Sequence, residues 1–379
     1  MALVLNEEQR LLKETAHEFL ATNAPVSALR TLRDSRDATG YDVDLWQQMT
    51  ELGWAGIALP EACGGLAFGF AGLGVVLEET GRTLCASPLF ASAVLGGNMV
   101  LLAGTKVQQA ELLPRIIGGE LTVALALEES NHHDPAATEM VAVRSENGYR
   151  LTGKKRFVLD GHSADKLLVV ARTSGSAGDR HGLSIFIVDG NDSGVSRRRT
   201  ILMDSRNAAE IELEDVQVSL SAVLGEPDLG WEPLTETLDR GRIAISAEML
   251  GGALECFERT VEYLKEREQF GVKIGSFQAL QHRAAHLLTE LELAKSVVMY
   301  ALSAVDENPS QVPMLASLAK ARMNDLFRDI SNEAVQMHGG IGVTDELEIG
   351  FFLKRARVAT QILGDSGFHQ NRFATLGGY

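Results

Sequence analysis

Hydrophobic residues recur at helical spacing through the first third of the chain. Leu12, Ala16 and Phe19 lie three or four positions apart, and Asn6 followed by Gln9 has the spacing of a capping box. This pattern predicts a helix that begins near Glu7. Similar patterns predict helices over 43–52, 70–83 and 89–103, the first ending at Gly53 and the last at Gly104. We therefore expect an all-helical N-terminal domain over residues 1–120.

The pattern changes at Leu121, where apolar segments become short and rich in β-formers. These segments are LTVALALEE, MVAVRSE, YRLTGKKRFVL, KLLVVART, LSIFIVD and IELEDVQV. Asn147-Gly148 lies between two of them and predicts a tight hairpin. The last segment alternates imperfectly, which a bulge near Glu214-Asp215 would explain. Residues 121–225 are therefore expected to form a middle antiparallel β-sandwich or barrel.

Helical spacing returns from Trp231 and continues almost to the end of the chain. Leu287, Leu291, Ala294 and Val298 illustrate the spacing, and the predicted helices are long. Long helices joined by few crossovers are typical of a four-helix bundle, which we expect over residues 226–379. The fold class is therefore α+β multidomain: helices, then strands, then a helical bundle.

Composition excludes several classes of function. The formal net charge of −16 argues against nucleic acid or an anionic membrane as a partner. The chain has no basic leader followed by an apolar stretch, and no apolar run near the ~20 residues that span a bilayer. Its three cysteines form no CxxC pair, so a reducing cytoplasmic location is expected.

Common catalytic and nucleotide-binding motifs are absent from the sequence. There is no GxGxxG, Walker A, HExxH or GxSxG pattern, which disfavours Rossmann-type binding. His132, His133 and Asp134 form the only metal-like cluster, but adjacent histidines cannot easily face one ion. A solvated loop is the favoured interpretation, and no metal site is predicted.

Three stretches are more specific together than singly. They are REQFG at 267–271 followed by SFQ at 276–278, QMHGGIG at 336–342, and LPEACGG at 59–65. At these residues the sequence resembles the acyl-CoA dehydrogenase family, whose three-domain fold has the same order of elements. Taken alone, Arg267 is compatible with a solvated helix charge and Gly271 with a helix C-cap. Gly339-Gly340 either ends a helix or allows close approach of a ligand to the backbone.

The resemblance implies an FAD cofactor shared across a subunit interface. Matched residue by residue, Arg267 and Gln278 would reach the pyrophosphate of a neighbouring subunit's FAD, with Phe270 near its adenosine half. Gln336, Gly339 and Gly340 would line the adenosine diphosphate path. An arginine suits this role because its planar fork can hold two phosphate oxygens. The resemblance also implies a tetramer built as a dimer of dimers, the usual assembly in the family.

The predicted flavin wall departs from the family pattern. Leu127-Glu128-Glu129 replaces Thr-Glu-Pro, and Phe157-Val158-Leu159 replaces Trp-Ile-Thr, so two hydroxyl groups are missing. Phe157 would still stack on the flavin, and backbone groups near Leu127 and Leu159 would provide hydrogen bonds. The alternative is that Phe157 and Leu159 are ordinary inward residues of a strand.

The substrate side departs from the family more strongly. Arg242 matches the family's arginine near the acyl-CoA chain, with Asp239 supporting it; a structural ion pair is the alternative. The two family positions for the catalytic glutamate fall on Gly364 and Gly241. Asp365, next to Gly364, is the candidate base, while the N–H of Gly364 would keep half of the oxyanion hole. Glu248 lies on roughly the same helix face as Gly241 but two turns away.

Three functional hypotheses follow. The first is FAD-dependent α,β-dehydrogenation of an acyl-CoA to a trans-2-enoyl-CoA, with electrons passed to an electron-transfer flavoprotein. The second is a non-catalytic subunit of a heterotetrameric acyl-CoA dehydrogenase, acting on fatty acyl or steroid side chains. The third, ranked lowest, is a flavin monooxygenase on the same scaffold. Acyl chain length and branching cannot be read from the sequence.

Overall fold

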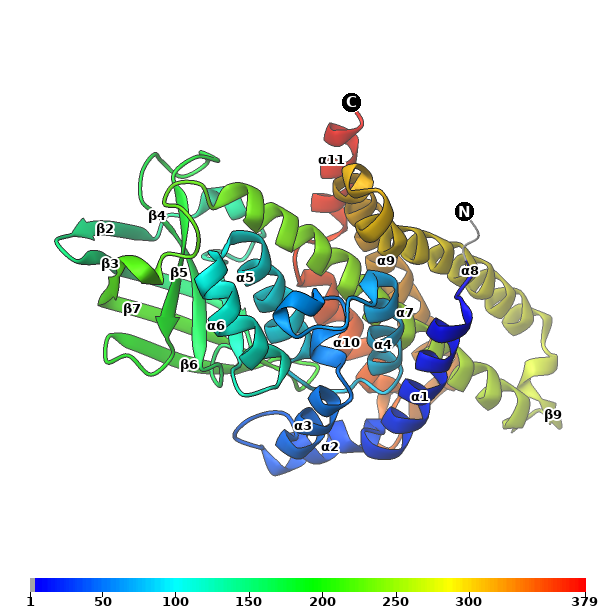
Figure 1. The fold of residues 1–379 in the computed structure, drawn as a ribbon. Helices are drawn as coiled ribbons and strands as arrows, with labels where there is room; N and C mark the ends of the chain where they lie inside the picture. The colour runs from blue at the N-terminus through cyan, green and yellow to red at the C-terminus, as the bar shows by residue number, and fades with distance from the viewer. Residues whose placement is uncertain (1–3) are drawn as a thin grey trace. The chain divides into compact units, whose positions relative to one another are not determined.

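The computed structural model describes residues 4–379, which divide into two compact units (Figure 1). Among the described residues, the first unit contains 4–35, 70–85 and 242–379, and the second contains 36–69 and 86–241. The expected N-terminal domain thus contributes helices to both units. The boundaries at 120 and 225 stay predictions.

The first unit begins with helices α1 (Glu7–Asn23) and α2 (Val26–Ser35), and α4 (Gly69–Arg82) joins them. The predicted capping box is present, because the Asn6 side chain accepts from the Gln9 backbone and the Gln9 side chain accepts in return. The pattern had not singled out α2.

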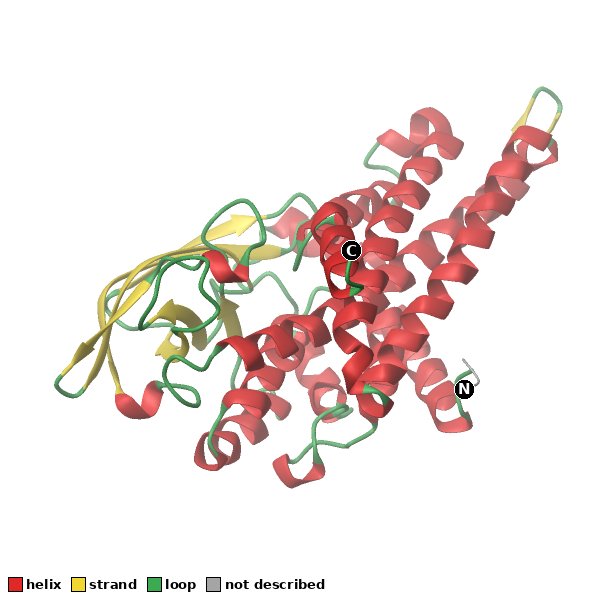
Figure 2. Ribbon diagram, turned by 90° about the horizontal axis from the view of Figure 1, so that it is seen from above, coloured by secondary structure: helices red, strands yellow, loops and turns green. Residues whose placement is uncertain are grey.

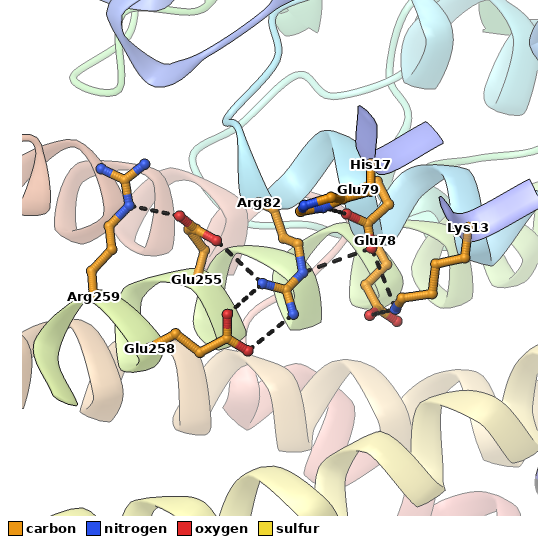
Figure 3. Close-up of polar contacts among 8 residues, drawn as sticks. All are labelled: Lys13, His17, Glu78, Glu79, Arg82, Glu255, Glu258 and Arg259. Atoms are coloured by element: carbon orange, nitrogen blue, oxygen red, sulfur yellow. Dashed lines mark hydrogen bonds and ion pairs between the residues drawn. The ribbon is translucent and has the colours of Figure 1, made fainter. Parts of the chain in front are cut away.

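A charged network ties α1 and α4 to helix α7 (Trp231–Glu266) within this unit (Figure 3). Arg82 donates to Glu258 at 2.8 Å and to Glu255 at 3.2 Å. Glu79 is almost fully buried and contacts His17 at 2.9 Å and Lys13 at 3.3 Å. Buried and partly buried ion pairs of this kind fix the mutual orientation of helices.

The remaining helices of the first unit form the bundle (Figure 2). They are α8 (Gln278–Glu307), α9 (Val312–His338), α10 (Ile349–Gln361) and α11 (Ser366–Leu376). Helix α9 packs against α8, α10 and α11, and its inward side is mostly apolar, including Ala316, Met323 and Phe327. A two-stranded hairpin, β8 (Glu268–Gln269) and β9 (Val272–Lys273), links α7 to α8. The predicted helical bundle is confirmed.

Helices α3 (Val43–Glu51), α5 (Asn98–Ala103) and α6 (Lys106–Ile117) belong to the second unit. The single helix expected over 89–103 is instead a π-helix over Leu89–Gly97 continued by α5. All nine residues of the π-helix are buried. Such segments depart from the α-helical hydrogen-bond ladder and are frequent near functional sites, and side-chain periodicity cannot distinguish them from α-helix.

A seven-stranded sheet is the centre of the second unit (Figure 1). The strands are β1 (Val123–Ala126), β2 (Val141–Ser145), β3 (Gly148–Leu159), β4 (Lys166–Arg172), β5 (Leu183–Asp189), β6 (Val195–Ile201) and β7 (Asn207–Ser219). Their order is β1-β4-β2-β3-β7-β6, with β5 also paired to β4. Most pairs are antiparallel, but β1–β4 and β2–β4 are parallel, so the sheet is mixed.

Two predicted details of the sheet are confirmed. The strands β2 and β3 form a hairpin with Ser145 opposite Gly148, although its turn is Glu146-Asn147 rather than the expected Asn147-Gly148, because Gly148 already pairs in β3. The register between β3 and β7 shifts beside Glu214-Asp215, and Asp215 has a φ of +52°. The order of helices, middle sheet and C-terminal helices agrees with the predicted fold class. Within residues 4–379, no helix is both long and apolar enough to cross a bilayer.

Candidate functional site

The hairpin after α7 carries the first group of predicted site residues. Arg267 directly follows α7, and Phe270 and Gly271 form the turn between β8 and β9 with φ values of +57° and +78°. The Phe270 ring is 91% exposed and packs edge-on against Phe277 at 6.2 Å. Gln278 begins α8. The hairpin therefore presents an aromatic ring and two polar side chains at one end of the bundle.

The C-terminal end of α9 lies at this same end of the bundle. The Tyr263 ring stacks on His338 with 4.3 Å between centroids, and its hydroxyl group donates to the His338 carbonyl at 3.4 Å. The Arg267 N–H donates to the Tyr263 carbonyl, so Arg267 lies one helical turn from this contact. Gln336, Gly339 and Gly340 flank His338 in the sequence. Burial lowers the pKa of His338, which favours a neutral ring.

These residues fit the diphosphate part of a nucleotide cofactor. The Arg267, Gln278 and Gln336 side chains are exposed, and Arg267 forms no ion pair within residues 4–379. A Cβ atom added at Gly339 or Gly340 would meet nothing within 4 Å, and Gly339 has a φ of +66°. The bare backbone is thus open to close approach, and the unpaired guanidinium is available to an anion.

The predicted flavin wall lies in the second unit, at the junction of β1 and β3. The Leu127 carbonyl accepts from Lys155 Nζ at 3.0 Å, and the Glu128 carbonyl accepts from the Arg156 N–H at 2.7 Å. Phe157 follows directly, half-buried, with a φ of +49°. A bulky residue in the left-handed region marks strain, which is common at ligand sites. Leu159 is half-buried and pairs with Ala208 on β7.

The His132-His133-Asp134 segment is divided by the fold. The ring of His133 is nearly buried and lies 2.5 Å from the Glu128 carboxylate, whereas His132 is exposed. Asp134 accepts from the Ala136 backbone. In the part of the chain that the structure describes, no three His, Cys, Asp or Glu side chains are arranged to hold a metal ion.

A tight turn between α10 and α11 contains both predicted catalytic positions. Leu363 and Gly364 have φ values of +58° and +112°. A Cβ atom at Gly364 would lie 2.6 Å from Cδ1 of Phe368 and 2.8 Å from Nε2 of His369. The position that matches the family glutamate is therefore shaped for glycine. The Asp365 side chain is exposed and accepts from the Phe368 N–H at 2.8 Å, which caps α11.

Arg242 packs against this turn. It is buried, its Nε donates to the Leu363 carbonyl at 3.2 Å, and its guanidinium carbon lies 5.4 Å from the centre of the Phe368 ring. Asp239 is buried on the same helix, α7. Glu248, also on α7, forms a buried ion pair with Arg355 at 2.8 Å, so its carboxylate is already engaged.

The sequence analysis missed Lys320, which lies beneath the same turn. Its Nζ donates to Asn324 Oδ1 at 2.5 Å, the Ala359 carbonyl at 3.0 Å and the Gly364 carbonyl at 3.2 Å. Its side chain is fully buried, and desolvation with Arg242 and Arg355 nearby holds its pKa well below the usual value. The available signal was a lysine four residues after Ala316 on the apolar face of a helix.

Comparisons with known proteins cover the whole chain. The models described as acyl-CoA dehydrogenase N-terminal, middle and C-terminal domains match residues 6–120, 124–216 and 228–375. The caffeyl-CoA reductase-Etf complex subunit CarC of Acetobacterium woodii is 30% identical over 97% of both chains. Butyryl-CoA dehydrogenase from Megasphaera elsdenii is 26% identical over the full length of both chains, with a TM-score of 0.91. A variant of the Tcur3481-Tcur3483 steroid ACAD is 31% identical over 98% of both chains, with a TM-score of 0.88.

Proposed function

Because this chain belongs to the acyl-CoA dehydrogenase family, we propose that it works in FAD-dependent α,β-dehydrogenation of an acyl-CoA thioester to a trans-2-enoyl-CoA. Electrons would pass to an electron-transfer flavoprotein, the kind of partner that the name of the Acetobacterium relative includes. The observation that carries the proposal is the grouping of exposed Arg267 and Gln278 with the open backbone of Gly339-Gly340 at one end of the bundle.

Bound FAD would supply the acceptor for the hydride that leaves the β-carbon. Arg267 and Gln278 are proposed to hold its pyrophosphate, Phe270 to pack near the adenosine half, and Gln336 with Gly339 and Gly340 to line the diphosphate path. Phe157 is proposed to face the flavin ring, with the backbone near Leu127 and Leu159. The cofactor-binding hairpin protrudes from one end of its own bundle (Figure 2), which supports sharing between subunits and thus a homotetramer or heterotetramer.

The substrate side is proposed to contain Asp239 and Arg242, with Asp365 as the base. Replacing Asp365 by Asn should abolish anaerobic flavin bleaching by acyl-CoA while leaving bound FAD unchanged, since the amide cannot accept the α-proton. Asp345→Asn, an exposed carboxylate elsewhere on the bundle, serves as the matched control. Bleaching that survives in Asp365→Asn would exclude Asp365 as the base.

A second candidate, a subunit that lacks its own base, is favoured by one specific observation. Phe368 and His369 fill the space that a side chain at Gly364 would need, and the Asp365 carboxylate caps a helix. Such a chain would assemble with a base-bearing homologue. The Tcur3481-Tcur3483 relative carries two chain names, which supports a heteromeric assembly as a model for this one.

Purification of the chain alone separates the two candidates. About one FAD per chain, bleached by acyl-CoA, would establish a self-sufficient dehydrogenase and exclude the second candidate. A folded chain with little FAD that gains it only with a homologous subunit would contradict the first. The cytoplasmic location is also a proposal, supported by three cysteines that form no disulfide.

A further inference from the structure

The turn at 363–365 has its carbonyl groups bonded from one side. The Leu363 carbonyl lies 3.2 Å from Arg242 Nε and 3.0 Å from His369 Nε2. The Gly364 carbonyl accepts from Lys320 Nζ at 3.2 Å and from Asn324 Nδ2 at 3.3 Å. All four of these side chains are buried. Two successive peptide groups are therefore held through their oxygen atoms by donors from inside the bundle.

The N–H groups of the same two peptides point the opposite way. No described peptide bond is cis, and in a trans peptide the C=O and N–H vectors are antiparallel. The N–H of Gly364 therefore points away from Arg242 and His369, and the N–H of Asp365 points away from Lys320 and Asn324. Neither N–H forms a hydrogen bond within residues 4–379.

Burying Lys320 to bond a carbonyl group costs folding free energy, which is hard to explain if its only role is stability. Its hydrogen-bond acceptors are an amide oxygen and backbone carbonyls, with no carboxylate among them. The charged groups that face it are Arg242 and Arg355, which disfavour its charge, and Asp365, which favours it. A buried lysine without a bonded counter-charge destabilises a fold, so such groups are concentrated at functional sites.

We propose that Lys320 is a positioning residue, which holds and polarises this turn so that the N–H groups of Gly364 and Asp365 face the carbonyl oxygen of a bound acyl thioester. A donor on a peptide oxygen strengthens the N–H of the same peptide as a donor. The two N–H groups would then stabilise the negative charge that develops on the thioester oxygen as the α-proton leaves. The inference rests on the proposed function but holds whichever group accepts that proton.

The test is the spectrum of a bound thioester, which needs no turnover. Cinnamoyl-CoA is the probe, because hydrogen bonds to its carbonyl oxygen shift its near-ultraviolet band to longer wavelength. Wild-type chain should produce this shift, and Lys320→Met should remove most of it while leaving the Kd for the probe within about threefold. With saturating acyl-CoA, flavin bleaching should slow by about tenfold with FAD content unchanged. This is less than the roughly 10²–10³ for loss of an oxyanion donor, because the N–H groups stay present and lose only their support.

Matched variants separate positioning from a general structural role. Lys106→Met removes an exposed lysine at the start of α6 and should leave the band shift unchanged. Lys320→Arg, which keeps a donor, should restore part of the shift. If Lys320→Met does not fold, Asn324→Leu removes the second donor to the same carbonyl and should reduce the shift.

Two results would overturn the inference. The first is no band shift with the wild-type chain, and the second is a shift with Lys320→Met and with Asn324→Leu as large as the wild-type shift. Failure of the proposed function has a different signature, which is a chain that binds neither FAD nor a partner's FAD. The band shift is measured on flavin-free chain as well, so it decides the role of Lys320 independently.

Discussion

Two fully buried lysines, one in each unit, are held in contrasting ways. Lys155, in the middle of β3, bonds the Glu129 carboxylate at 2.6 Å and the Leu127 carbonyl at 3.0 Å. Lys320, on α9, bonds only neutral oxygen atoms. Desolvation lowers the pKa of both, but Glu129 opposes the effect at Lys155. A fully buried lysine is therefore stabilised by a carboxylate in the sheet, whereas in the bundle its burial is not offset by a bonded carboxylate.

The difference indicates separate purposes. Glu129 also accepts from the backbone N–H groups of Glu139 and Met140, so the Lys155 pair joins the segment after β1 to β3 and to the start of β2. That arrangement supports the fold around the strained Phe157. Lys320 supports a turn whose outward N–H groups are unused within the described chain. The comparison teaches that a paired buried charge secures structure, whereas an unpaired one points to a site.

Breaking the paired lysine should have the largest effect on stability. In Glu129→Gln the ammonium group of Lys155 stays buried without its counter-charge, which should cost about 3 kcal/mol of unfolding free energy. The measurement is the urea midpoint followed by circular dichroism. Glu212→Gln is the control, because Glu212 pairs with the neighbouring but exposed Lys154 and should leave the midpoint unchanged. Equal midpoints for both variants would show that the buried pair is not formed.

Adding a side chain at Gly364, in the turn that Lys320 bonds, should have the next largest effect on stability. Gly364→Ala adds a Cβ atom 2.6 Å from the Phe368 ring, at a φ of +112°, and should cost about 2 kcal/mol. Gly340→Ala meets no atom within 4 Å and should change stability by less than about 0.5 kcal/mol. Thermal melts of the two variants check this, and equal stability would contradict the packing described for the turn.

The unpaired lysine should appear in the pH dependence of stability. Its folded pKa is below the usual 10.5, so between these values the unfolded chain binds a proton that the folded chain lacks. Stability should therefore rise with pH up to about 10.5, and wild type should gain on Lys320→Met over this rise. The corresponding gain in stability of wild type over Lys155→Met should be smaller, because Glu129 opposes the lowering of the Lys155 pKa. If the urea midpoints of wild type and Lys320→Met change with pH in parallel, then Lys320 does not have the lowered pKa of a buried lysine without a bonded carboxylate.

The exposed ion pairs of Asp345 with Arg30 and Arg33 should have the smallest effect on stability among the interactions compared. Asp345 binds Arg30 at 2.7 Å and Arg33 at 2.6 Å, joining α2 to the segment before α10, and Arg33 lowers its pKa to about 2. Its contribution should be present above about pH 3.8 and disappear as pH falls through 2. Asp345→Asn should lower the thermal midpoint less than Glu129→Gln or Gly364→Ala does, and high salt should remove the difference. A larger loss than for Gly364→Ala would reverse this order.

Local patterns predicted much of the fold. The Asn6–Gln9 capping box, the hairpin between β2 and β3 and the bulge at Glu214-Asp215 each depend on residues close in sequence, and each is present, the hairpin with its turn one residue earlier than expected. The π-helix over Leu89–Gly97 and the parallel pairing of β1 with β4 were not predicted. The parallel pairing depends on a partner distant in sequence, and a π-helix has the same apolar run as a buried α-helix, so periodicity reports neither.

The candidate site follows the same division. Arg267, Gln278, Gln336, Gly339 and Gly340 were recognised from motifs, and the structure brings them to one end of a bundle through the contact of Tyr263 with His338. Asp365 was chosen for its carboxylate, but its capping of α11 depends on the turn geometry. Lys320 carries no motif, because only the approach of α10 and the following turn to α9 gives it a role.

The sequence by itself determined the family, the order of helical and β segments, and the absence of a glutamate at both positions where the family has one. These properties are local, since they follow from residue type and spacing. Only the tertiary structure decided that Gly364 has no room for a side chain, that Glu248 is engaged by Arg355, and that Lys320 is buried without a bonded carboxylate. Burial, charge pairing and the direction of a peptide group arise when distant segments pack together, and no single segment of the chain contains that information.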